Sequence, residues 1–332
     1  MKAIKILTMA ALATAVFASC SSEDELAQSN YPMDNVVRIM TSVDGMNTRA
    51  SYGNSTDKLN SFGFCINNAG NTKYTYDNIK VTKEGNNWNP ATQMLWQNST
   101  TAVDILAYAP YQETTEDATG KVKVFGKTDY AFSVKEDQSN AEDYSSDLIV
   151  YKQTGFTPGT NLNTNQAVNV AFTHLLSQLN LTIELRDQFN QDEKKPVTSA
   201  TVTDVKVDGT FIRSKVNFAA DPISFLRDGQ ASAAITPETV AFKKADKTTD
   251  HATFKYSAIV IPQRVYAGQL CIKFKVDGTD YIWTGSDDAL FESGKKYELH
   301  LLVGKDVVQG GAISAKPWGE GTTGTTGSLE TD

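Results

Sequence analysis

The strongest constraint on the fold is a series of short segments in which apolar and polar residues alternate. In residues 177–185, SQLNLTIEL, and 296–303, KYELHLLV, nearly every second residue is apolar. Successive side chains of a β-strand point to opposite faces, so this pattern predicts strands with one buried face. Antiparallel sheets commonly have one buried and one solvated face, which makes them the expected arrangement here.

Similar segments follow one another past residue 50, separated by Gly, Asn, Asp, Pro and Thr. The pattern predicts strands at 59–67, 78–83, 102–109, 130–134, 147–151, 176–185, 199–207, 209–218, 253–262, 268–276, 280–284 and 296–303. Val-Asp-Gly occurs at 207–209 and 276–278, and Asp-Gly favours the tight turn of a hairpin. Because no segment carries a long helical stripe, we expect an all-β chain of two tandem antiparallel β-sandwich domains.

The turn-rich loop TPGTNLNTNQ, residues 157–166, suggests where the two domains meet. We expect an N-terminal β-sandwich over residues 50–170 and a C-terminal β-sandwich over 171–332. Residues 319–332, GEGTTGTTGSLETD, show no apolar periodicity, so they form a flexible tail in this interpretation.

Residues 1–20 have the features of a targeting segment that is not part of the fold. Lys2 and Lys5 precede an apolar run at 6–17, which is too short for a bilayer-spanning helix of about 20 residues. Small residues before Cys20 resemble the bacterial lipobox, in which the cysteine becomes lipidated. The acidic run 21–25 resembles a surface-export signal. The alternative for residues 1–20 is an ordinary secretory signal in which the cysteine is incidental. The alternative for residues 21–25 is a solvated linker.

One more strand is expected before residue 50, at residues 36–43. Val37, Ile39, Thr41 and Val43 alternate with more polar or flexible residues, and the polar stretch that follows contains a single arginine, Arg49. A strand joined to the chain through such a stretch can be cut off by a protease. The alternative interpretation of Arg49 is an ordinary arginine in a surface loop.

Charge and chemistry exclude several classes of function. The net charge of −8 comes without a visible basic face, so nucleic acid is not an expected partner. The chain has three histidines and no catalytic, phosphate-binding or metal-ligand motif, so we expect no enzyme activity, cofactor or metal. We interpret His174 as a buried, hydrogen-bonded residue, His300 as solvated and His251 as a loop residue. Cys65 and Cys271 are expected to be unpaired thiols.

Several segments, taken in order, resemble those of the fimbrillin family, the shaft and tip pilins of type V pili of Gram-negative anaerobes. The matching segments are the lipobox, AVDILAYAPY (102–111), SDLIVYK (146–152), AFTHLLSQLNLTIEL (171–185), AIVIPQ (258–263), SGKKYELHLLVGKD (293–306) and ISAKPWGEG (313–321). This resemblance implies transthyretin-like sandwiches and a precursor that reaches the outer membrane as a lipoprotein. An arginine-specific protease would then cut between Arg49 and Ala50, removing the propeptide 21–49 with its strand.

The resemblance also implies that the site vacated by the strand is filled by a strand from another pilin subunit. Head-to-tail donation of this kind produces a filament of one or several kinds of subunit at the cell surface. The candidate donor is the C-terminal region Val307–Trp318, with the candidate residues Val307, Val308, Ala312, Ile313, Ala315 and Trp318. Without donation the chain would be a tip subunit. A host glycan or host protein is the expected adhesive ligand.

Two other functions fit parts of the sequence. An outer-membrane lipoprotein that binds a glycan or a host ligand without polymerising would keep Arg49 uncut and use exposed aromatic side chains. A secreted β-rich hydrolase would require paired carboxylates, for which Asp287 and Asp288 are adjacent candidates.

Overall fold

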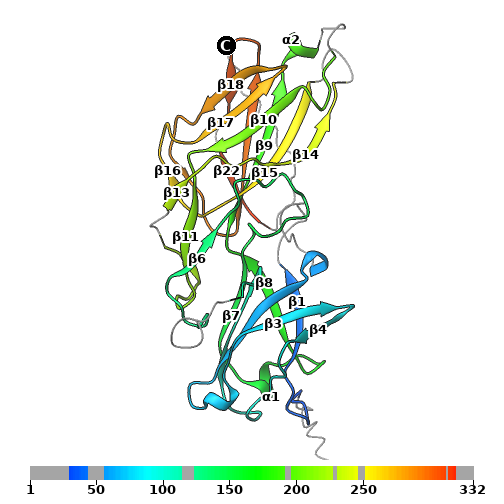
Figure 1. The fold of residues 1–332 in the computed structure, drawn as a ribbon, viewed down its shortest axis with the longest axis vertical. Helices are drawn as coiled ribbons and strands as arrows, with labels where there is room; N and C mark the ends of the chain where they lie inside the picture. Colours follow the sequence, from blue (N-terminus) through cyan, green and yellow to red (C-terminus); the bar gives the residue numbers. More distant parts are fainter. Residues whose placement is uncertain are drawn as a thin grey trace, which may run out of the picture.

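The chain forms an elongated molecule with two lobes stacked along its long axis (Figure 1). The computed structural model describes residues 30–43, 56–113, 123–190, 196–226, 230–245, 251–311 and 313–318. Its regular structure is nearly all β, as predicted. The helical elements are single turns, namely α1 (Pro158–Asn161), α2 (Asp187–Asn190) and the 3-10 turns Thr56–Lys58 and Thr72–Tyr74. No helix among these residues is long and apolar enough to cross a membrane.

The N-terminal lobe is built on one seven-stranded sheet in the order β1-β8-β7-β5-β2-β3-β4. Its strands are β1 (Arg38–Val43), β2 (Ser61–Asn67), β3 (Tyr76–Glu84), β4 (Asn87–Pro90), β5 (Val103–Ala109), β7 (Ile149–Phe156) and β8 (Ala167–His174). Neighbouring strands run antiparallel, with one exception, because β1 pairs with β8 in parallel.

The sheet folds over on itself, so that β1 and β8 cover the core formed by the other strands. β7 pairs with β5 from Ile149 to Phe156 but with β8 only through Ile149 and Val150. Phe172 of β8 packs edge-on against Phe62 of β2, with ring centroids 5.3 Å apart. β1 and β8 therefore form a second layer that is only two strands wide.

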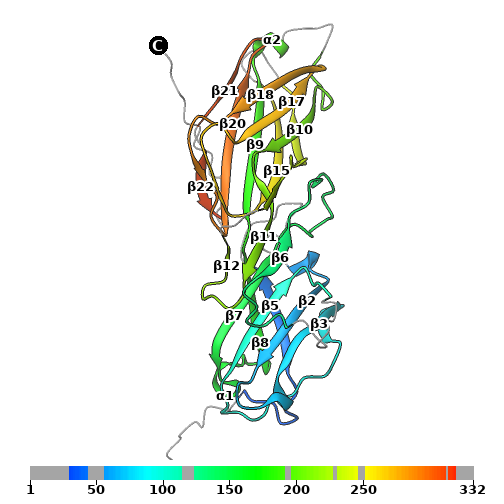
Figure 2. The ribbon, with the colours of Figure 1, turned by 60° about the vertical axis from the view of Figure 1, so that its left-hand side comes forward.

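The C-terminal lobe contains two facing sheets and two smaller ones (Figure 2). The large sheet has the order β14-β15-β9-β20-β21, with β22 also on β20, and the facing sheet has the order β10-β17-β18. Their strands are β9 (Ser177–Leu185), β10 (Val202–Asp208), β14 (Glu238–Lys243), β15 (Ala252–Val260), β17 (Cys271–Val276), β18 (Thr279–Thr284), β20 (Lys295–Val303), β21 (Val308–Gly310) and β22 (Ser314–Pro317).

The small sheets lie toward the junction of the lobes, and one of them combines strands from both halves of the chain. In it, β11 (Phe211–Asn217) pairs with β6 (Tyr130–Ser133), β12 (Ser224–Phe225) and β13 (Gln230–Ser232), while β16 (Arg264–Val265) pairs with β19 (Ala289–Leu290). Tyr130 and Phe218 pack against Tyr108 of β5. Because β5 is buried on both faces, the lobes share a continuous apolar contact. The division into domains at residue 170 stays a prediction, although the chain changes sheet between His174 and Ser177.

The alternation of the sequence locates most strands, and the exceptions are instructive. The prediction missed β4, β8 and β14, and also the short strands β12, β13, β16 and β19. No strand is predicted at β8, which follows the turn-rich loop 157–166, yet Val168, Val170 and Phe172 are buried and the residues between them are exposed.

The two Val-Asp-Gly segments differ in outcome. At 276–278 the hairpin prediction is confirmed, since Val276 pairs with Thr279 and both Asp277 and Gly278 have positive φ, as a tight turn requires. At 207–209 the prediction is wrong. β10 and β11 enter different sheets, and Gly209 instead lies against the backbone of Gln269.

We expect the two glycines to respond differently to alanine. At Gly278 a Cβ meets open space, so the cost is that of a left-handed alanine, about 1–2 kcal/mol. At Gly209 the same φ penalty applies, and a Cβ also lies 1.9 Å from the carbonyl oxygen of Gln269. Gly209→Ala should therefore lower the free energy of unfolding more than Gly278→Ala, as measured by urea denaturation. Equal losses would contradict the close approach at Gly209.

Candidate functional site

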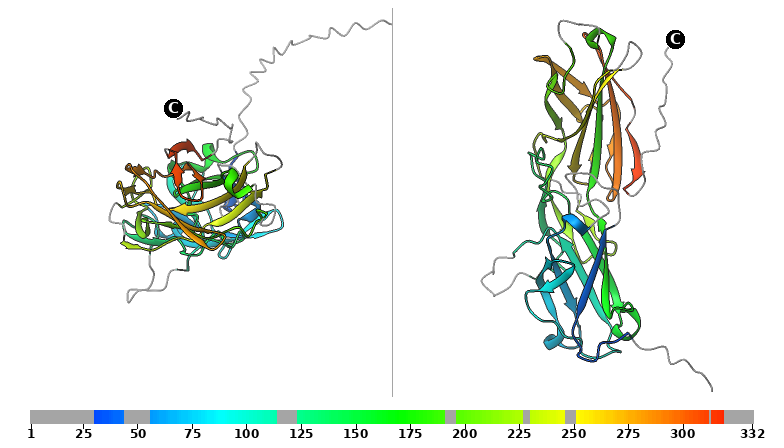
Figure 3. Two further views of the ribbon diagram at one scale, coloured as in Figure 1. Left: turned by 90° about the horizontal axis from the view of Figure 1, so that it is seen from above. Right: turned by 90° about the vertical axis from the view of Figure 1, so that its right-hand side faces the viewer.

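The strand predicted at residues 36–43 exists and lies at the edge of the N-terminal sheet. All six residues of β1 pair with β8, from Arg38 opposite Ala167 to Val43 opposite Phe172. β1 thus adds to β8 as a complete parallel strand. In Figure 3 it runs along the lower lobe toward the junction (dark blue, right view).

β1 covers the core with the face that the alternation predicts. Val37, Ile39 and Val43 are only 3%, 7% and 6% exposed, and Thr41 is half-buried. Burying three such apolar side chains contributes roughly 1.5–3 kcal/mol each before the entropy of ordering the strand is subtracted. The hydroxyl of Thr41 is buried and has no hydrogen-bond partner in the structure, so it detracts from that gain.

The start of β1 is also tied to the opposite side of the lobe. The Val37 amide donates to the Met94 carbonyl at 3.0 Å, and the Trp96 amide donates to the Asn35 carbonyl at 2.8 Å. Beyond these bonds, Arg38 donates to Asp34, which holds the pKa of that carboxyl below its usual range. Both groups are exposed, so the pair adds little to stability.

β8 depends on β1 for most of its ladder. Among the described residues, Ala167–Phe172 of β8 pair with no strand other than β1, and only Thr173 and His174 pair with β7. We call the β8 edge at Ala167–Phe172, with the core side chains that β1 covers, the β1 seat. An empty seat leaves the 168–172 stretch of β8 with unpaired backbone groups above an open apolar surface, while the amide and carbonyl of Ala167 keep their bonds to Asn163.

The C-terminal segment, Val307–Trp318, lies on the edge of its own lobe. β21 pairs with Leu301–Val303 and β22 pairs with Lys295–Glu298, both antiparallel to β20. Of the candidate donor residues, Val307 and Ala315 are exposed, Val308 and Ile313 are half-buried, and Trp318 is buried. Ala312 lies outside the described residues.

The pairing of β22 with β20 is poor in detail. Lys316 lies opposite Lys296, and like charges directly opposite each other destabilise a sheet. Burial lowers the pKa of Lys296. Ala315 offers only a methyl group opposite the buried Tyr297, and Pro317 cannot donate a hydrogen bond to the ladder. The strand is therefore held weakly along its length.

Its end is held more firmly, at the junction of the lobes. The ring of Trp318 stacks on that of His174 with centroids 4.1 Å apart and an angle of 9°. His174 Nδ1 lies 2.9 Å from Asp147 Oδ1, and both of these side chains are fully buried. The interpretation of His174 as a buried, hydrogen-bonded residue is confirmed. We call Asp147, His174 and Trp318 the junction stack.

Three predicted site residues, Cys20, Arg49 and Ala50, lie outside the described residues, so their roles stay predictions. Sequence reasoning missed β8, the strand that receives β1, although its alternating residues Val168, Val170 and Phe172 carried the signal. It also did not foresee that His174 and Trp318 meet.

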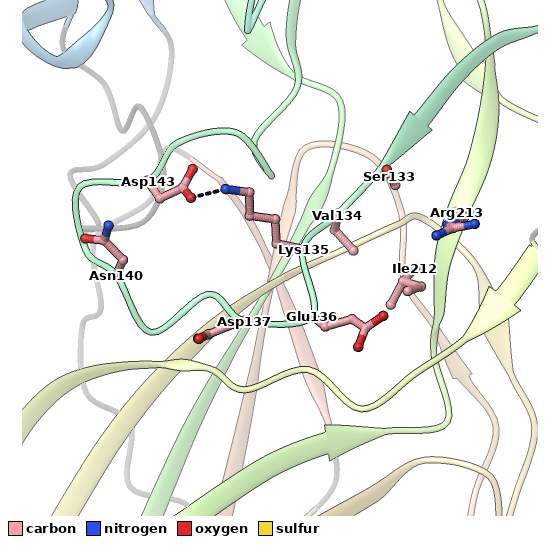
Figure 4. A pocket seen from close by; sticks show the side chains of 9 residues that line it. All are labelled: Ser133, Val134, Lys135, Glu136, Asp137, Asn140, Asp143, Ile212 and Arg213. Carbon is pink, nitrogen blue, oxygen red and sulfur yellow. Dashed lines mark hydrogen bonds and ion pairs between the residues drawn. The ribbon is translucent and has the colours of Figure 1, made fainter.

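The remaining candidate groups for chemistry can be placed within the described residues. The described residues contain no group of three or more potential ligands placed to hold a metal. Asp288 accepts from Arg264 and from the Ala267 amide, which is a structural role. Cys65 and Cys271 are free. The depression in Figure 4 is lined by surface side chains such as Glu136, Asp137 and Arg213, with Lys135 paired to Asp143.

One polar cluster does have a marked electrostatic character. Glu184 on β9 accepts from His300 at 2.7 Å and from His251 at 2.5 Å, and His251 also contacts Asp187. These hydrogen bonds, that from His300 first, lower the pKa of Glu184 to about 2. His300 is exposed, in agreement with its interpretation as a solvated residue, and His251 lies just before β15.

The lowered pKa of Glu184 makes a contribution to stability that depends on pH. Because the folded-state pKa lies below the usual 4.5, the contribution is complete above pH 4.5 and is lost as the pH falls toward 2. Glu184→Gln should therefore flatten the decline of the urea midpoint between pH 4.5 and 2.5. His300→Ala, which removes the main donor, should do so in part, and an unchanged decline in both variants would contradict the assignment.

The burial of β1 predicts a contrast between adjacent residues. Ile39→Ala should lower the free energy of unfolding of the N-terminal lobe by about 2–5 kcal/mol, because it leaves a cavity under the strand. Met40→Ala should change it by less than about 0.5 kcal/mol, because Met40 is exposed. Urea denaturation of the uncut chain measures both. Similar losses at the two positions would show that β1 does not cover the core.

The fold has relatives among solved structures. The chain matches a candidate cell-adhesion protein from Bacteroides ovatus with a TM-score of 0.60 and 12% identity, covering 85% of this chain and 97% of that one. A candidate cell-adhesion protein from Bacteroides uniformis matches with a TM-score of 0.54 and 19% identity, over 86% and 99%. A fimbrial protein from Bacteroides vulgatus matches with a TM-score of 0.51 and 16% identity, over 85% and 99%.

At these identities the structural matches show a shared fold. A search of curated proteins finds no significant match. The family comparison is more specific, because the model described as fimbrillin-like matches residues 48–318, which is most of the chain and includes every described strand except β1. The chain belongs to the fimbrillin-like family.

Proposed function

We propose that the chain is a structural and adhesive subunit of a surface fimbria that polymerises by strand exchange once β1 has been removed. The observation that supports this most directly is the pairing of β1. It is the first strand described, and it is the only strand partner of Ala167–Phe172 of β8 within the described residues. Its loss opens the β1 seat and otherwise breaks only the short bridge of residues 35–37 to Met94–Trp96.

The energetics favour refilling of the seat. An open edge of six residues and an exposed core are costly, and a strand from a second subunit can restore both the hydrogen bonds and the burial. β1 and the candidate donor belong to different lobes. The strand that fills an empty β1 seat therefore comes from another subunit and not from the same chain's C-terminal segment. Donation from one copy to the next builds an open chain.

The donor in this proposal is the C-terminal segment. In the structure it occupies an outer edge, where it leaves without disturbing the strands inside the sheet. The pairing of β22 with β20 is weak, because Lys316 lies opposite Lys296 and Ala315 lies opposite Tyr297. Little stabilising free energy is therefore lost when the segment leaves β20 to be donated.

The steps before assembly rest on the residues outside the described ranges. Cys20 is lipidated and holds the precursor at the outer membrane, and an arginine-specific protease cuts between Arg49 and Ala50. The family match begins at residue 48, so β1 belongs to the part of the chain that precedes the matched segment. Other pilin subunits are the partners, and a host glycan or host protein is the ligand.

The tryptophans do not favour the non-polymerising glycan binder. Trp96 and Trp318 are buried and Trp88 and Trp283 are half-buried, so none of the four is an open stacking platform, and the exposed aromatic side chains are Tyr266 and Phe211 among the large hydrophobic residues described. We propose no enzymatic role.

Limited proteolysis tests the proposal. Residues 21–332 treated with an arginine-specific protease should yield Ala50 as the new N-terminus, followed by a ladder of oligomers that resist SDS. Arg49→Ala should prevent both the cut and the ladder. Arg38 is an internal control, since its place in the β1 ladder should protect it from cleavage in the intact precursor.

A cut product that stays a stable monomer with an intact Ala50 terminus would overturn strand exchange. Resistance of Arg49 to the protease would overturn the processing step.

A further inference from the structure

β8 connects the two places at which strands are exchanged in the proposed function. Its first six residues carry β1, and its last residue, His174, carries the ring of Trp318 at the end of the C-terminal segment. The β1 seat and the end of β22 are thus joined by one continuous strand, which runs toward the junction of the lobes (Figures 1 and 2).

The position of His174 is defined by contacts at the end of β8. Ile149 of β7 lies opposite it, Asp147 contacts its Nδ1 atom, and the Leu175 amide donates to the Leu148 carbonyl at 2.8 Å. Trp318 then covers the buried ring of His174, and the Trp318 amide donates to the Gly294 carbonyl at 3.0 Å. A small rotation or shift of β8 changes the plane on which the indole stacks.

Removal of β1 takes away most of what holds β8. Six paired residues lose their partner, and the two that remain paired, Thr173 and His174, are the ones next to the junction stack. Any displacement of the unsupported strand is therefore transmitted to His174, the residue on which Trp318 stacks.

The hold on Trp318 is itself finely balanced. The ring is only 4% exposed, but its indole N–H is buried without a hydrogen-bond partner in the structure. An unpaired buried donor opposes the gain from stacking. The adjoining β22 adds little, because of the lysine pair and the small Ala315 side chain.

We propose that the junction stack couples the two strands: β1 in its seat keeps Trp318 on His174, and loss of β1 releases the C-terminal segment for donation. The inference rests on the proposed function. It means that the cut at Arg49 prepares the subunit both to accept a strand and to donate one. A precursor that still carries β1 then has neither an open seat nor a free donor. By linkage, a seated Trp318 also stabilises β1.

Hydrogen exchange measured by mass spectrometry tests the coupling. The samples are residues 21–332, the same chain cut at Arg49, and the cut chain with a synthetic peptide of residues 30–43, all diluted so that monomers can be followed. The readout is the exchange of the peptide that covers residues 313–318. We expect exchange to be at least tenfold faster after the cut and to slow again when the synthetic peptide refills the seat.

Two variants separate coupling from general loosening. Trp318→Ala should give fast exchange at 313–317 before and after the cut, with residues 30–43 of the uncut chain still protected but less than in the parent, as linkage requires. Trp318→Phe, which can stack on His174 without an unpaired indole N–H, should restore the difference between cut and uncut chains. Phe242→Leu, which changes an aromatic pair with Phe254 at the other edge of the large sheet, should leave the difference unchanged.

The outcomes distinguish this inference from the proposed function. If exchange at 313–318 is the same with and without β1, the coupling is wrong, even if the cut chain forms the oligomer ladder. If exchange accelerates after the cut and the peptide reverses it, the coupling holds, even if no ladder forms and the polymerisation proposal fails.

Discussion

The parallel ladder between β1 and β8 is the interaction on which the N-terminal lobe depends. The layer that closes the lobe is two strands wide, and β1 is one of the two. Without it, six residues of β8 have no strand partner among the described residues, and the side chains under Val37, Ile39 and Val43 face water. The lobe is thus complete only when something occupies this position, which is an unusual requirement for a stable domain and a useful one for a building block.

The C-terminal lobe follows a different principle. Its β9, β15 and β20 form the centre of a sheet whose ladders span nine and eight paired residues, and the apolar face of each strand is buried. Only the outermost addition, β21 and β22, is short and poorly matched. One lobe therefore has an edge strand that completes a two-stranded layer, and the other has short edge strands outside an extensive sheet. The junction stack lies where the two meet.

Period-two alternation was enough to locate β1 and most strands of both lobes, because each burial pattern is local to its segment. It missed β8, where Asn163–Gln166 reads as a loop and masks the strand that follows. It also mistook Val207–Gly209 for a hairpin, since Asp-Gly reports a turn but not the sheet that the next strand enters. The stack of Trp318 on His174 joins segments far apart in the sequence, so no local pattern encodes it.

The direction of β8 has a mechanical consequence. β1 and β8 lie along the long axis of the molecule, in the direction in which subunits joined end to end would be pulled (Figures 1 and 3). Tension along that axis loads a seated strand in shear, so the hydrogen bonds of all six paired residues share the force and must yield together. A strand lying across the axis would instead peel off one bond at a time. In the proposed assembly, a donor strand seated along this axis would therefore resist traction.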